Sequence, residues 1–282
     1  MYKDLRQTGD YTKYAKNIGW EVERVGKNYC FIKKFSIVGS VVKLQRPGKI
    51  GHKDIKILGY LAKRYRAYQI GVEPTTSEHV PLLVKFGYKI SRYPSLPSKT
   101  ILIDLNKNDK DLMNGMHYKT RYNIGKAKRN KLAVHRSENI KEFADLWQKN
   151  SKSWGMFLPQ TSEITALFKA FDGDAKIIFA KKGKDIVAGV MAVNTKDIIY
   201  YMYAFSTPLG NKLFAPTLLV WEIINYAKEK ELKLFDFGGV YDERFPLPSW
   251  IGFTRFKESF GGMVVEYPGL YVKSLLPFGL TF

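Results

Sequence analysis

The stretch that decides the fold begins with IIYYMYAFS (198–206) and ends with LKLFDFGGV (232–240). Between these runs, residues 215–230 carry apolar side chains at helical spacing and end in a charged sequence. Short apolar runs rich in Ile, Tyr, Phe and Val are typical of strands, so this stretch predicts a strand, a helix and a strand. Two further runs precede it, AKIIFAKKG (175–183) and DIVAGVMAVN (185–194), and the glycine between them predicts a hairpin. The second half of the chain therefore reads β-β-β-α-β.

The first half repeats part of this pattern, because a pair of apolar runs again precedes an amphipathic segment and a further short run. The predicted strands are NYCFIKKF (28–35), SVVKLQR (40–46), IGVEP (70–74), YKISRYP (88–94) and KTILIDL (99–105), and the predicted helices are residues 52–68 and 78–86. This self-similarity predicts a mixed α/β (α+β) fold in two similar domains, residues 1–141 and 142–282. Each domain is expected to be a mixed twisted sheet flanked by helices.

The composition is that of a folded, basic protein. Of the 282 residues, 45% are hydrophobic and 15% aromatic, which excludes a disordered, collagen-like or low-complexity chain. A single cysteine, Cys30, excludes an intrachain disulfide and a zinc site of several cysteines, as fits a reducing compartment. The N-terminal sequence has no apolar segment, and no apolar run approaches the roughly 18 residues of a membrane span. We therefore expect a cytoplasmic protein.

The positive charge is concentrated in the first half. Residues 1–141 hold 30 Lys and Arg against 11 Asp and Glu, whereas residues 142–282 hold 16 against 15. A surplus on one side attracts polyanions, which makes nucleic acid, nucleotide diphosphates and anionic membranes the candidate partners. The densest region is the helix-compatible segment LMNGMHYKTRYNIGKAKRNK (112–131), which would connect the domains. Its helical spacing places cations and a tyrosine on one face, which suits a phosphate-bearing partner, and the residues concerned are Lys119, Tyr122, Lys126 and Arg129, with Lys128 nearby.

Several common site motifs do not occur in the sequence. It has no P-loop, no GxGxxG after a strand, no HExxH and no GxSxG, and its four histidines have no metal-ligand spacing, so neither a cofactor nor a metal is predicted. The β-β-β-α-β order resembles the GNAT acyltransferases, which bind the pyrophosphate of coenzyme A with a glycine-rich loop before their long helix. The corresponding loop, STPLGNKLFAP (206–216), has a single glycine, which disfavours acyl-CoA as the donor.

A more specific resemblance rests on several segments in a fixed order, namely LPSKTILIDL (96–105), HYKTRYNIGKAKRNKL (117–132), YYMYAFS (200–206), LLVWEIINYAKEKELKLFDFGGV (218–240) and GFTRFKESFGG (252–262). These segments resemble the FemABX family of peptidoglycan-bridge aminoacyltransferases. The resemblance implies two GNAT-like domains, aminoacyl-tRNA as the donor, and an amine on the stem peptide of a cell-wall precursor as the acceptor. It is consistent with the duplicated halves, the poor pyrophosphate loop and the basic surface.

The resemblance also implies roles for individual residues. Lys257 corresponds to a family lysine at the reaction centre, with Phe256 beside it, and would stabilise the oxyanion of the transfer step. Without the resemblance, alternation along a strand would place Phe256 inward and Lys257 outward in solvent. Tyr201 and Tyr203, two residues apart on a predicted strand, are expected to face the same side and to line the substrate cleft. Asp236 is expected to be structural first.

Further candidate residues would hold phosphate groups. Arg121 and Tyr122 lie in the best-matched string and are assigned to the precursor diphosphate or the tRNA backbone. Near the N-terminus, Lys16 or Lys13 corresponds to a family lysine that reaches the precursor diphosphate. Both a UDP-linked and a lipid-linked acceptor are compatible with these residues, and the sequence leaves the transferred amino acid and the oligomeric state open.

Two regions depart from the family pattern or add to it. The segment KNSKSWGMFLPQTSE (149–163) lacks the Arg and Tyr that the family carries there, so Lys152 or Trp154 would have another role. The apolar stretch LYVKSLLPFGLTF (270–282) is expected to close the core of the second domain, with contact to the inner face of the membrane as the alternative.

Two other functions are compatible with the sequence. The first alternative is a GNAT-fold N-acyltransferase that uses acyl-CoA or another acyl donor. The second is a non-catalytic RNA-binding module, in which the basic segment binds phosphates and Lys257 has no chemical role. Dependence on aminoacyl-tRNA and on Lys257 distinguishes the leading prediction from both.

Overall fold

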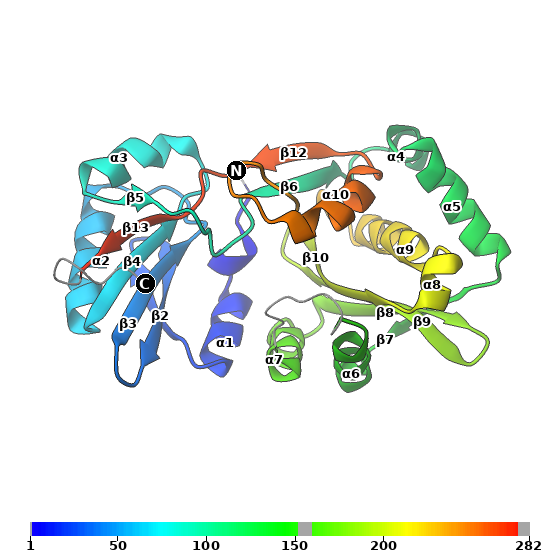
Figure 1. Cartoon of the computed structure of the whole chain (residues 1–282), viewed down its shortest axis with the longest axis horizontal. Helices are drawn as coiled ribbons and strands as arrows, with labels where there is room; N and C mark the ends of the chain where they lie inside the picture. The colour runs from blue at the N-terminus through cyan, green and yellow to red at the C-terminus, as the bar shows by residue number, and fades with distance from the viewer. Residues whose placement is uncertain (1, 152–159, 276–282) are drawn as a thin grey trace. The chain divides into compact units, whose positions relative to one another are not determined.

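The computed structural model describes residues 2–151 and 160–275. The mixed α and β fold predicted from the sequence is confirmed, since two mixed sheets carry helices on their faces (Figure 1). The described residues form two compact units: residues 2–99, 242–246 and 266–275 make up the first, and residues 100–151, 160–241 and 247–265 the second. No helix within these described ranges is both long enough and apolar enough to cross a bilayer.

The first unit is built on a sheet with the strand order β1-β2-β3-β4-β13-β5. Its strands are β1 (Glu21–Val25), β2 (Asn28–Phe35), β3 (Gly39–Gln45), β4 (Ala67–Glu73), β5 (Lys89–Ile90) and β13 (Tyr271–Ser274). Its helices are η1 (Leu5–Gln7), α1 (Gly9–Asn17), α2 (His52–Arg64), η2 (Ser77–His79) and α3 (Val80–Lys85). Strands β1 to β3 are antiparallel, and α2 then connects β3 to the parallel strand β4.

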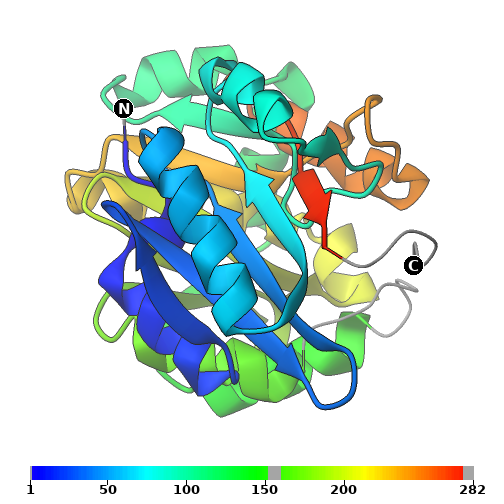
Figure 2. The same cartoon turned by 90° about the vertical axis from the view of Figure 1, so that its left-hand side faces the viewer.

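Helix α2 forms where the sequence places one apolar face between suitable ends. The Asp54 carboxylate accepts the backbone N–H of Gly51 at 2.8 Å, which satisfies a donor at the first turn, and Lys63 and Arg64 lie in the last turn. Ile55, Leu58 and Leu61 are buried in the core that the helix shares with the strands. Figure 2 shows α2 covering one face of the sheet.

The second unit has a sheet with the order β12-β6-β11-β10-β9-β8-β7. Its strands are β6 (Lys99–Asp104), β7 (Ala133–Ser137), β8 (Ala175–Lys182), β9 (Asp185–Asn194), β10 (Ile198–Ser206), β11 (Leu234–Gly239) and β12 (Met263–Glu266). Its helices are α4 (Asp109–Gly115), α5 (Tyr118–Arg129), α6 (Ile140–Ser151), α7 (Thr161–Ala170), α8 (Pro208–Lys212), α9 (Ala215–Glu229), η4 (Pro248–Trp250) and α10 (Ile251–Glu258). As in the first unit, antiparallel strands lead to a parallel pair, here β10 and β11, which is joined through a helix.

Alternation along β8 explains how this sheet is covered on both faces. Ile178 and Ala180 belong to the core that contains α9, whereas the ring of Phe179 lies 6.1 Å from that of Phe143 on α6. Figure 1 shows α9 on one side of the sheet and α6 on the other. Because both faces are buried, β8 and β9 read as nearly continuous apolar runs in the sequence.

The division of the chain differs from the boundary expected between residues 141 and 142, which falls inside α6 of the second unit. The reason is pairing and packing across long sequence distances. Strand β6 pairs with β11, and Ile124 and Ala127 of α5 enter the same core as α9. The basic segment is therefore an integral helix of the second unit.

The described part of the C-terminal stretch, residues 270–275, belongs to the first unit, so the expectation that it closes the core of the second domain is wrong for these residues. Strand β13 is antiparallel to both β4 and β5, with Tyr271 opposite Val72 on one side and Ile90 on the other. It thus satisfies the backbone groups at the edge of β4, which would otherwise lack sheet partners. Residues 276–282, and with them most of the proposed membrane contact, lie outside the described residues, as do Lys152 and Trp154.

Candidate active site

A bulge at the end of β11 shapes the candidate site. The register between β11 and β6 shifts between Asp236 and Gly239, and Gly238 has a φ of +69°, which a glycine adopts without steric cost. The carboxylate of Asp236, only 8% exposed, accepts the Gly238 N–H at 2.7 Å and the Thr100 hydroxyl at 2.5 Å. The structural role expected for Asp236 is therefore confirmed, because this side chain holds the bulge in place.

Lys257 contacts this bulge from helix α10. Its ammonium nitrogen donates a hydrogen bond to the Gly239 carbonyl oxygen at 2.6 Å and lies 4.8 Å from the centre of the Phe253 ring. Burial lowers the pKa of Lys257 from its usual 10.5 to about 8, while the nearby charge of Asp236 acts in the opposite direction. The solvent-exposed strand lysine that simple alternation would give is wrong, because α10 is a helix and carries Lys257 inward.

A cavity of about 360 Å³ lies next to this lysine's helix. It is lined by Phe253 and Phe256 of α10, by Tyr201, Ala204, Phe205 and Ser206 of β10, and by Asn211, Phe214, Pro216 and Thr217 around the start of α9. Most of its lining is aromatic or small, with hydroxyl groups at Ser206 and Thr217. Phe256 and Phe253 thus connect Lys257 to a space that can hold a small acyl group.

Tyr201 and Tyr203 do not face the same side of the sheet, and that expectation is wrong. A bulge in β10 shifts the register between them, so that Tyr201 pairs with Ala192 and Tyr203 with Met191. Tyr201 lies against the core on the cavity side, where its ring is 5.9 Å from that of Phe237, and burial raises its pKa. Tyr203 instead makes an edge contact with Trp147 of α6. Only Tyr201 of the pair lines the cavity.

The loop that would bind a pyrophosphate in an acyl-CoA enzyme uses its amides internally. The Thr207 hydroxyl accepts the Gly210 N–H, and the backbone N–H of Asn211 is donated to the Thr207 carbonyl. The N–H of Leu213 is likewise donated to Leu209, so the segment forms the short helix α8. These donors are not directed at a ligand, which agrees with the weak loop signal in the sequence.

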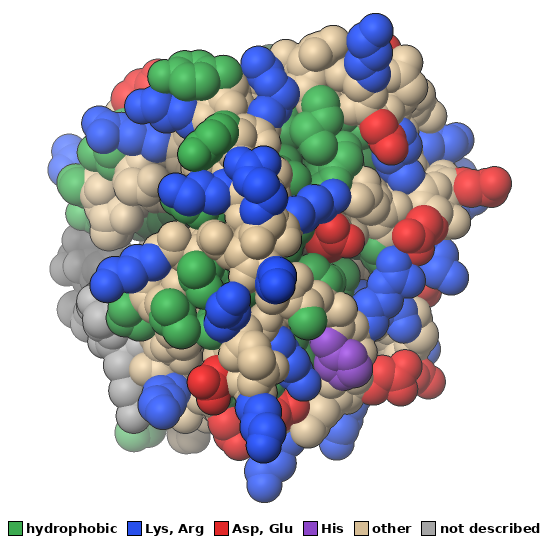
Figure 3. Space-filling view, turned by 90° about the vertical axis from the view of Figure 1, so that its right-hand side faces the viewer, with side chains coloured by type: hydrophobic (Ala, Val, Ile, Leu, Met, Phe, Trp, Pro, Cys, Tyr) green, Lys and Arg blue, Asp and Glu red, His purple; other side chains and the backbone are tan. Residues whose placement is uncertain are grey.

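The basic face predicted on α5 is present and reaches the cavity wall. Lys119, Tyr122 and Arg129 are exposed, and Lys128 is exposed beside them. The ammonium of Lys126 stands 5.8 Å from the Tyr122 ring and 5.1 Å from the ring of Phe214, which itself lines the cavity. Figure 3, seen from the side where α5 lies in Figure 1, shows Lys and Arg side chains spread over this surface.

Arg121, Lys13 and Lys16, which were also predicted to bind phosphate, lie away from the cavity lining or make other contacts. The guanidinium of Arg121 donates to the carbonyl oxygens of Met113 and Met116 and so braces the turn between α4 and α5. Lys13 pairs with Asp10 at 2.8 Å, and Lys16 is exposed on α1. Both lysines belong to the first unit, whereas Lys257 and its cavity belong to the second.

Sequence reasoning missed Thr100, Phe253 and Phe214 as parts of the site. Phe253 precedes Lys257 by four residues, which is the spacing of neighbours on one helix face, so a predicted helix over 251–258 would have found it. Thr100 and Phe214 belong to the site because their segments pair and pack with distant parts of the chain, and a local sequence pattern cannot predict such contacts.

Comparison with known proteins supports the sequence motifs. Residues 160–279 match the FemAB family model. The chain is 25% identical over 171 residues to aminoacyltransferase FemA of Staphylococcus epidermidis, covering 60% of this chain and 36% of that protein. It is 27% identical over 154 residues to the UDP-N-acetylmuramoylpentapeptide-lysine N(6)-alanyltransferase of Weissella viridescens, covering 52% and 45%. The matches thus span less than half the length of these curated relatives.

Solved structures agree on the fold. The crystal structure of FemX superposes with a TM-score of 0.80 at 18% identity, covering 96% of this chain and 92% of that one. A tandem GNAT protein from the clavulanic acid biosynthesis pathway gives 0.56 at 11% identity, covering 93% and 85%. The predicted resemblance to the FemABX family and the GNAT-like fold are confirmed.

Proposed function

We propose that this chain is an aminoacyltransferase that moves an amino acid from aminoacyl-tRNA to an amine on the stem peptide of a peptidoglycan precursor. The observation that carries the proposal is the position of Lys257, held at 2.6 Å by the Gly239 carbonyl on a helix that also lines an acyl-sized cavity. The names of the relatives support both the reaction class and the precursor class.

Because an aminoacyl ester is already activated, the enzyme needs only to position the amine against the ester carbonyl and to stabilise the oxyanion that forms. The precursor amine attacks the ester carbonyl, a C–N bond forms, and the carbonyl oxygen becomes an oxyanion. The intermediate then collapses, the C–O bond to the ribose breaks, and the proton lost by the amine is balanced by protonation of the leaving hydroxyl. A protonated Lys257 would stabilise the oxyanion, a contribution of roughly 3 kcal/mol for one well-placed donor.

Two observations favour tRNA over coenzyme A as the carrier of the donor group. The amides of the α8 segment are consumed by internal hydrogen bonds, so they do not form a pyrophosphate cradle. The cations of α5 extend from the exposed Lys119 to the half-buried Lys126, whose ammonium lies 5.1 Å from the ring centre of the cavity residue Phe214, and such a row suits an RNA backbone.

A transfer assay tests the proposal. Purified protein would receive a pool of radiolabelled aminoacyl-tRNAs with either the UDP-linked or the lipid-linked muropeptide, beside a labelled acetyl-CoA control. We expect label to move from tRNA to one precursor, to fall at least 100-fold in Lys257→Ala, and to be unchanged in Lys184→Ala, an exposed lysine on the β8–β9 turn. Transfer from acetyl-CoA alone would support the acyl-CoA alternative, and RNA binding without transfer in any arm would support the binding module.

A further inference from the structure

The tip of the β2–β3 hairpin, residues 35–38, exposes large apolar side chains to solvent. Phe35, Ile37 and Val38 are 43%, 96% and 52% exposed. Hairpin connections are usually made of Gly, Asn, Asp, Pro or Ser, which are small or polar. A single exposed apolar side chain is ordinary, but three within four residues form a patch that the core of the first unit does not cover.

This hairpin tip projects from one end of the sheet (Figure 1). On one side, the neighbouring strand β1 begins opposite Ile32. On the other side, the neighbouring strand β4 begins opposite Ser40. Residues 35–39 therefore extend beyond both neighbours. The apolar side chains of the tip can thus reach an extended surface before the rest of the sheet does.

The base of the hairpin tip is held in place. Gly39 has a φ of +96°, and a Cβ at this position would overlap the backbone carbonyl oxygen of Arg66. The same carbonyl oxygen accepts the Ser40 N–H at 3.3 Å. The ring of Phe35 lies 6.4 Å from that of Tyr68 on β4. Because the hairpin is supported in this way, little conformational freedom is lost when its tip binds a partner.

Positive charge gathers beside the hairpin tip, where the end of α2 lies against β2. The Tyr65 ring, directly after α2, is 5.3 Å from the Lys34 ammonium and 5.3 Å from the Arg64 guanidinium. The cations on the hairpin and at this end of α2 are Lys33, Lys34, Lys63, Arg64 and Arg66.

Acidic side chains neutralise only part of this charge. Lys34 and Arg64 each pair with a glutamate of β1. Lys63 and Arg66 are exposed and have no ion pair within the part of the chain that the structure describes. The apolar tip is therefore flanked by a positive excess. This arrangement is complementary to a bilayer with anionic lipids, since apolar side chains can enter its apolar layer while the cations stay among the headgroups.

We propose that the β2–β3 hairpin binds the surface of an anionic bilayer. Stable attachment to a membrane generally needs two signals, an apolar insertion and a basic patch, and the hairpin supplies both. The proposal rests on the first unit alone and is independent of the aminoacyltransferase activity.

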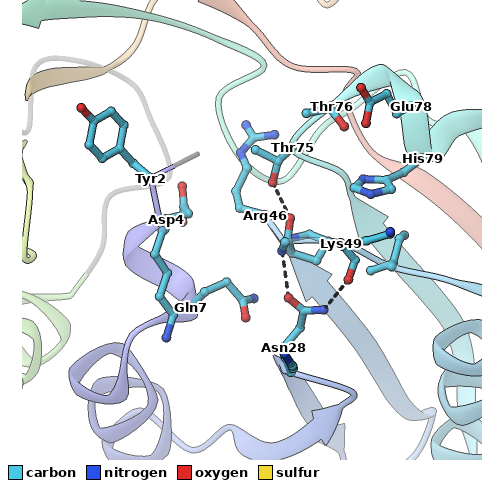
Figure 4. A pocket seen from close by; sticks show the side chains of 15 residues that line it. Tyr2, Asp4, Gln7, Asn28, Arg46, Lys49, Thr75, Thr76, Glu78 and His79 are labelled. Atoms are coloured by element: carbon cyan, nitrogen blue, oxygen red, sulfur yellow. Dashed lines mark hydrogen bonds between the residues drawn. The ribbon is translucent and has the colours of Figure 1, made fainter.

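A membrane bound at the hairpin would leave the other end of the sheet free. That end holds a cavity of about 690 Å³, whose walls come from the segment before α1, the β1–β2 turn and the segments after β3 and β4 (Figure 4). The hairpin tip lies between the end of β2 and the start of β3, so the sheet separates the two features.

Sedimentation of the full chain with vesicles tests the apolar part of the surface. The vesicles would consist of phosphatidylcholine alone or of equimolar phosphatidylcholine and phosphatidylglycerol, and we expect binding to the mixed vesicles. Ile37→Ser/Val38→Ser should lower the partition coefficient at least 10-fold. The control Met263→Ser/Val264→Ser, which changes two consecutive exposed apolar residues of β12, should stay within 2-fold of the original chain.

A second pair of variants tests the charges. Lys63→Ala/Arg66→Asn removes the two cations that have no ion pair, and asparagine tolerates the φ of +50° at residue 66. Lys53→Ala/Lys56→Ala removes two exposed lysines near the start of the same helix and lowers the net charge equally. We expect binding to the mixed vesicles to fall at least 5-fold in the first variant and less than 2-fold in the second.

A fluorophore reports the contact directly. Cys30, the single cysteine of the chain, is buried, so a thiol-reactive, environment-sensitive dye would label Ile37→Cys selectively. Its emission should shift to shorter wavelength on the mixed vesicles, whereas the same dye on Lys53→Cys should not shift.

Three outcomes would overturn the proposal. The first is an unshifted dye at residue 37, and the second is an equal loss of binding within either matched pair of variants. The third is a chain that binds no vesicle but self-associates in a way that Ile37→Ser/Val38→Ser abolishes, which would identify a second copy as the occupant of the hairpin tip.

Discussion

The ammonium nitrogen of Lys257 lies 2.6 Å from the carbonyl oxygen of Gly239, so that a lysine of α10 is tied to the bulge that ends β11. The bulge is in turn held by Asp236 and Thr100. These contacts determine both the position of the Lys257 ammonium and its pKa.

The activity should fall as the pH rises through about 8. Lys257 has its pKa lowered to about 8, so it is protonated below that pH and loses its charge above it. If the charged form stabilises the oxyanion, a plot of log kcat/KM between pH 6 and 10 should show a descending limb near 8. In Lys257→Arg any residual activity should lack that limb, because arginine stays charged. A limb that persists in this variant would assign it to another group.

Replacing Lys257 by Met should stabilise the fold at pH 7. The lowering of the Lys257 pKa from 10.5 to about 8 means that burying the charged ammonium destabilises the folded state by about 3 kcal/mol, a cost that methionine removes. Methionine also loses the hydrogen bond to Gly239, which destabilises the folded state by about 1 kcal/mol. Urea unfolding should therefore show a gain of about 2 kcal/mol. Between pH 8 and 10.5 the unfolded wild-type chain binds more protons than the folded chain, so wild-type stability rises there and the difference should shrink. An unchanged difference at pH 10.5 would contradict this account.

Asp236 should position Lys257 and tune its pKa, whereas Thr100 should act only through geometry. The negative charge of Asp236 raises the pKa of Lys257. In Asp236→Asn the descending limb of the pH profile should therefore move to lower pH. In Thr100→Val the carboxylate stays, and the limb should remain near 8 while kcat falls. A purely structural role for Asp236 would leave the limb in place.

Two glycines should respond oppositely to alanine. A Cβ on Gly210 would overlap the backbone carbonyl oxygen of Val187, which cannot move aside like a side-chain tip. Gly210→Ala should therefore destabilise the protein by about 1–3 kcal/mol. Gly59 lies inside α2 with open space around it, so Gly59→Ala should stabilise by about 1 kcal/mol. Thermal and urea unfolding of both variants provide the measurement.

The cations of α5 should govern the salt dependence of RNA binding. Lys126→Ala/Arg129→Ala should weaken tRNA binding and reduce the slope of log K against log salt by about 2, roughly one for each lost phosphate contact. The control Lys141→Ala/Lys149→Ala removes the same charge from exposed positions of α6. Equal changes in both double variants would indicate a diffuse field in place of a defined face.

Local patterns predicted much of the fold because the corresponding elements are specified by neighbouring residues. The hairpin of β8 and β9 forms around Gly183, whose φ of +62° suits a tight turn, and α9 spans nearly the predicted range. The bulge after Tyr201 could not be read from the alternation, because it depends on the register with β9. The place of β13 could not be read either, since its partners lie far earlier in the chain.

The candidate site, like the fold, could be predicted from the sequence only in part. Lys257 was identified through the family resemblance, and its burial depends on α10 packing beside the end of β11. Phe256 was predicted next to it and lines the cavity, while Phe214 and Thr217 enter from another segment. The sequence shows which residue types are present. It does not show which of them lie close together, because that depends on pairing and packing between segments far apart in the chain.

The insertion of β13 between β4 and β5 has a consequence for synthesis on the ribosome. β1 to β5 leave the ribosome early, yet their sheet lacks an internal strand until residues 91–270 have also been made. Until β13 has been made, β4 and β5 lack the strand that pairs with both of them. During the same interval the second unit is synthesised and can begin to fold. Translation order and folding order are thus expected to differ, with the unit translated first being the one completed last.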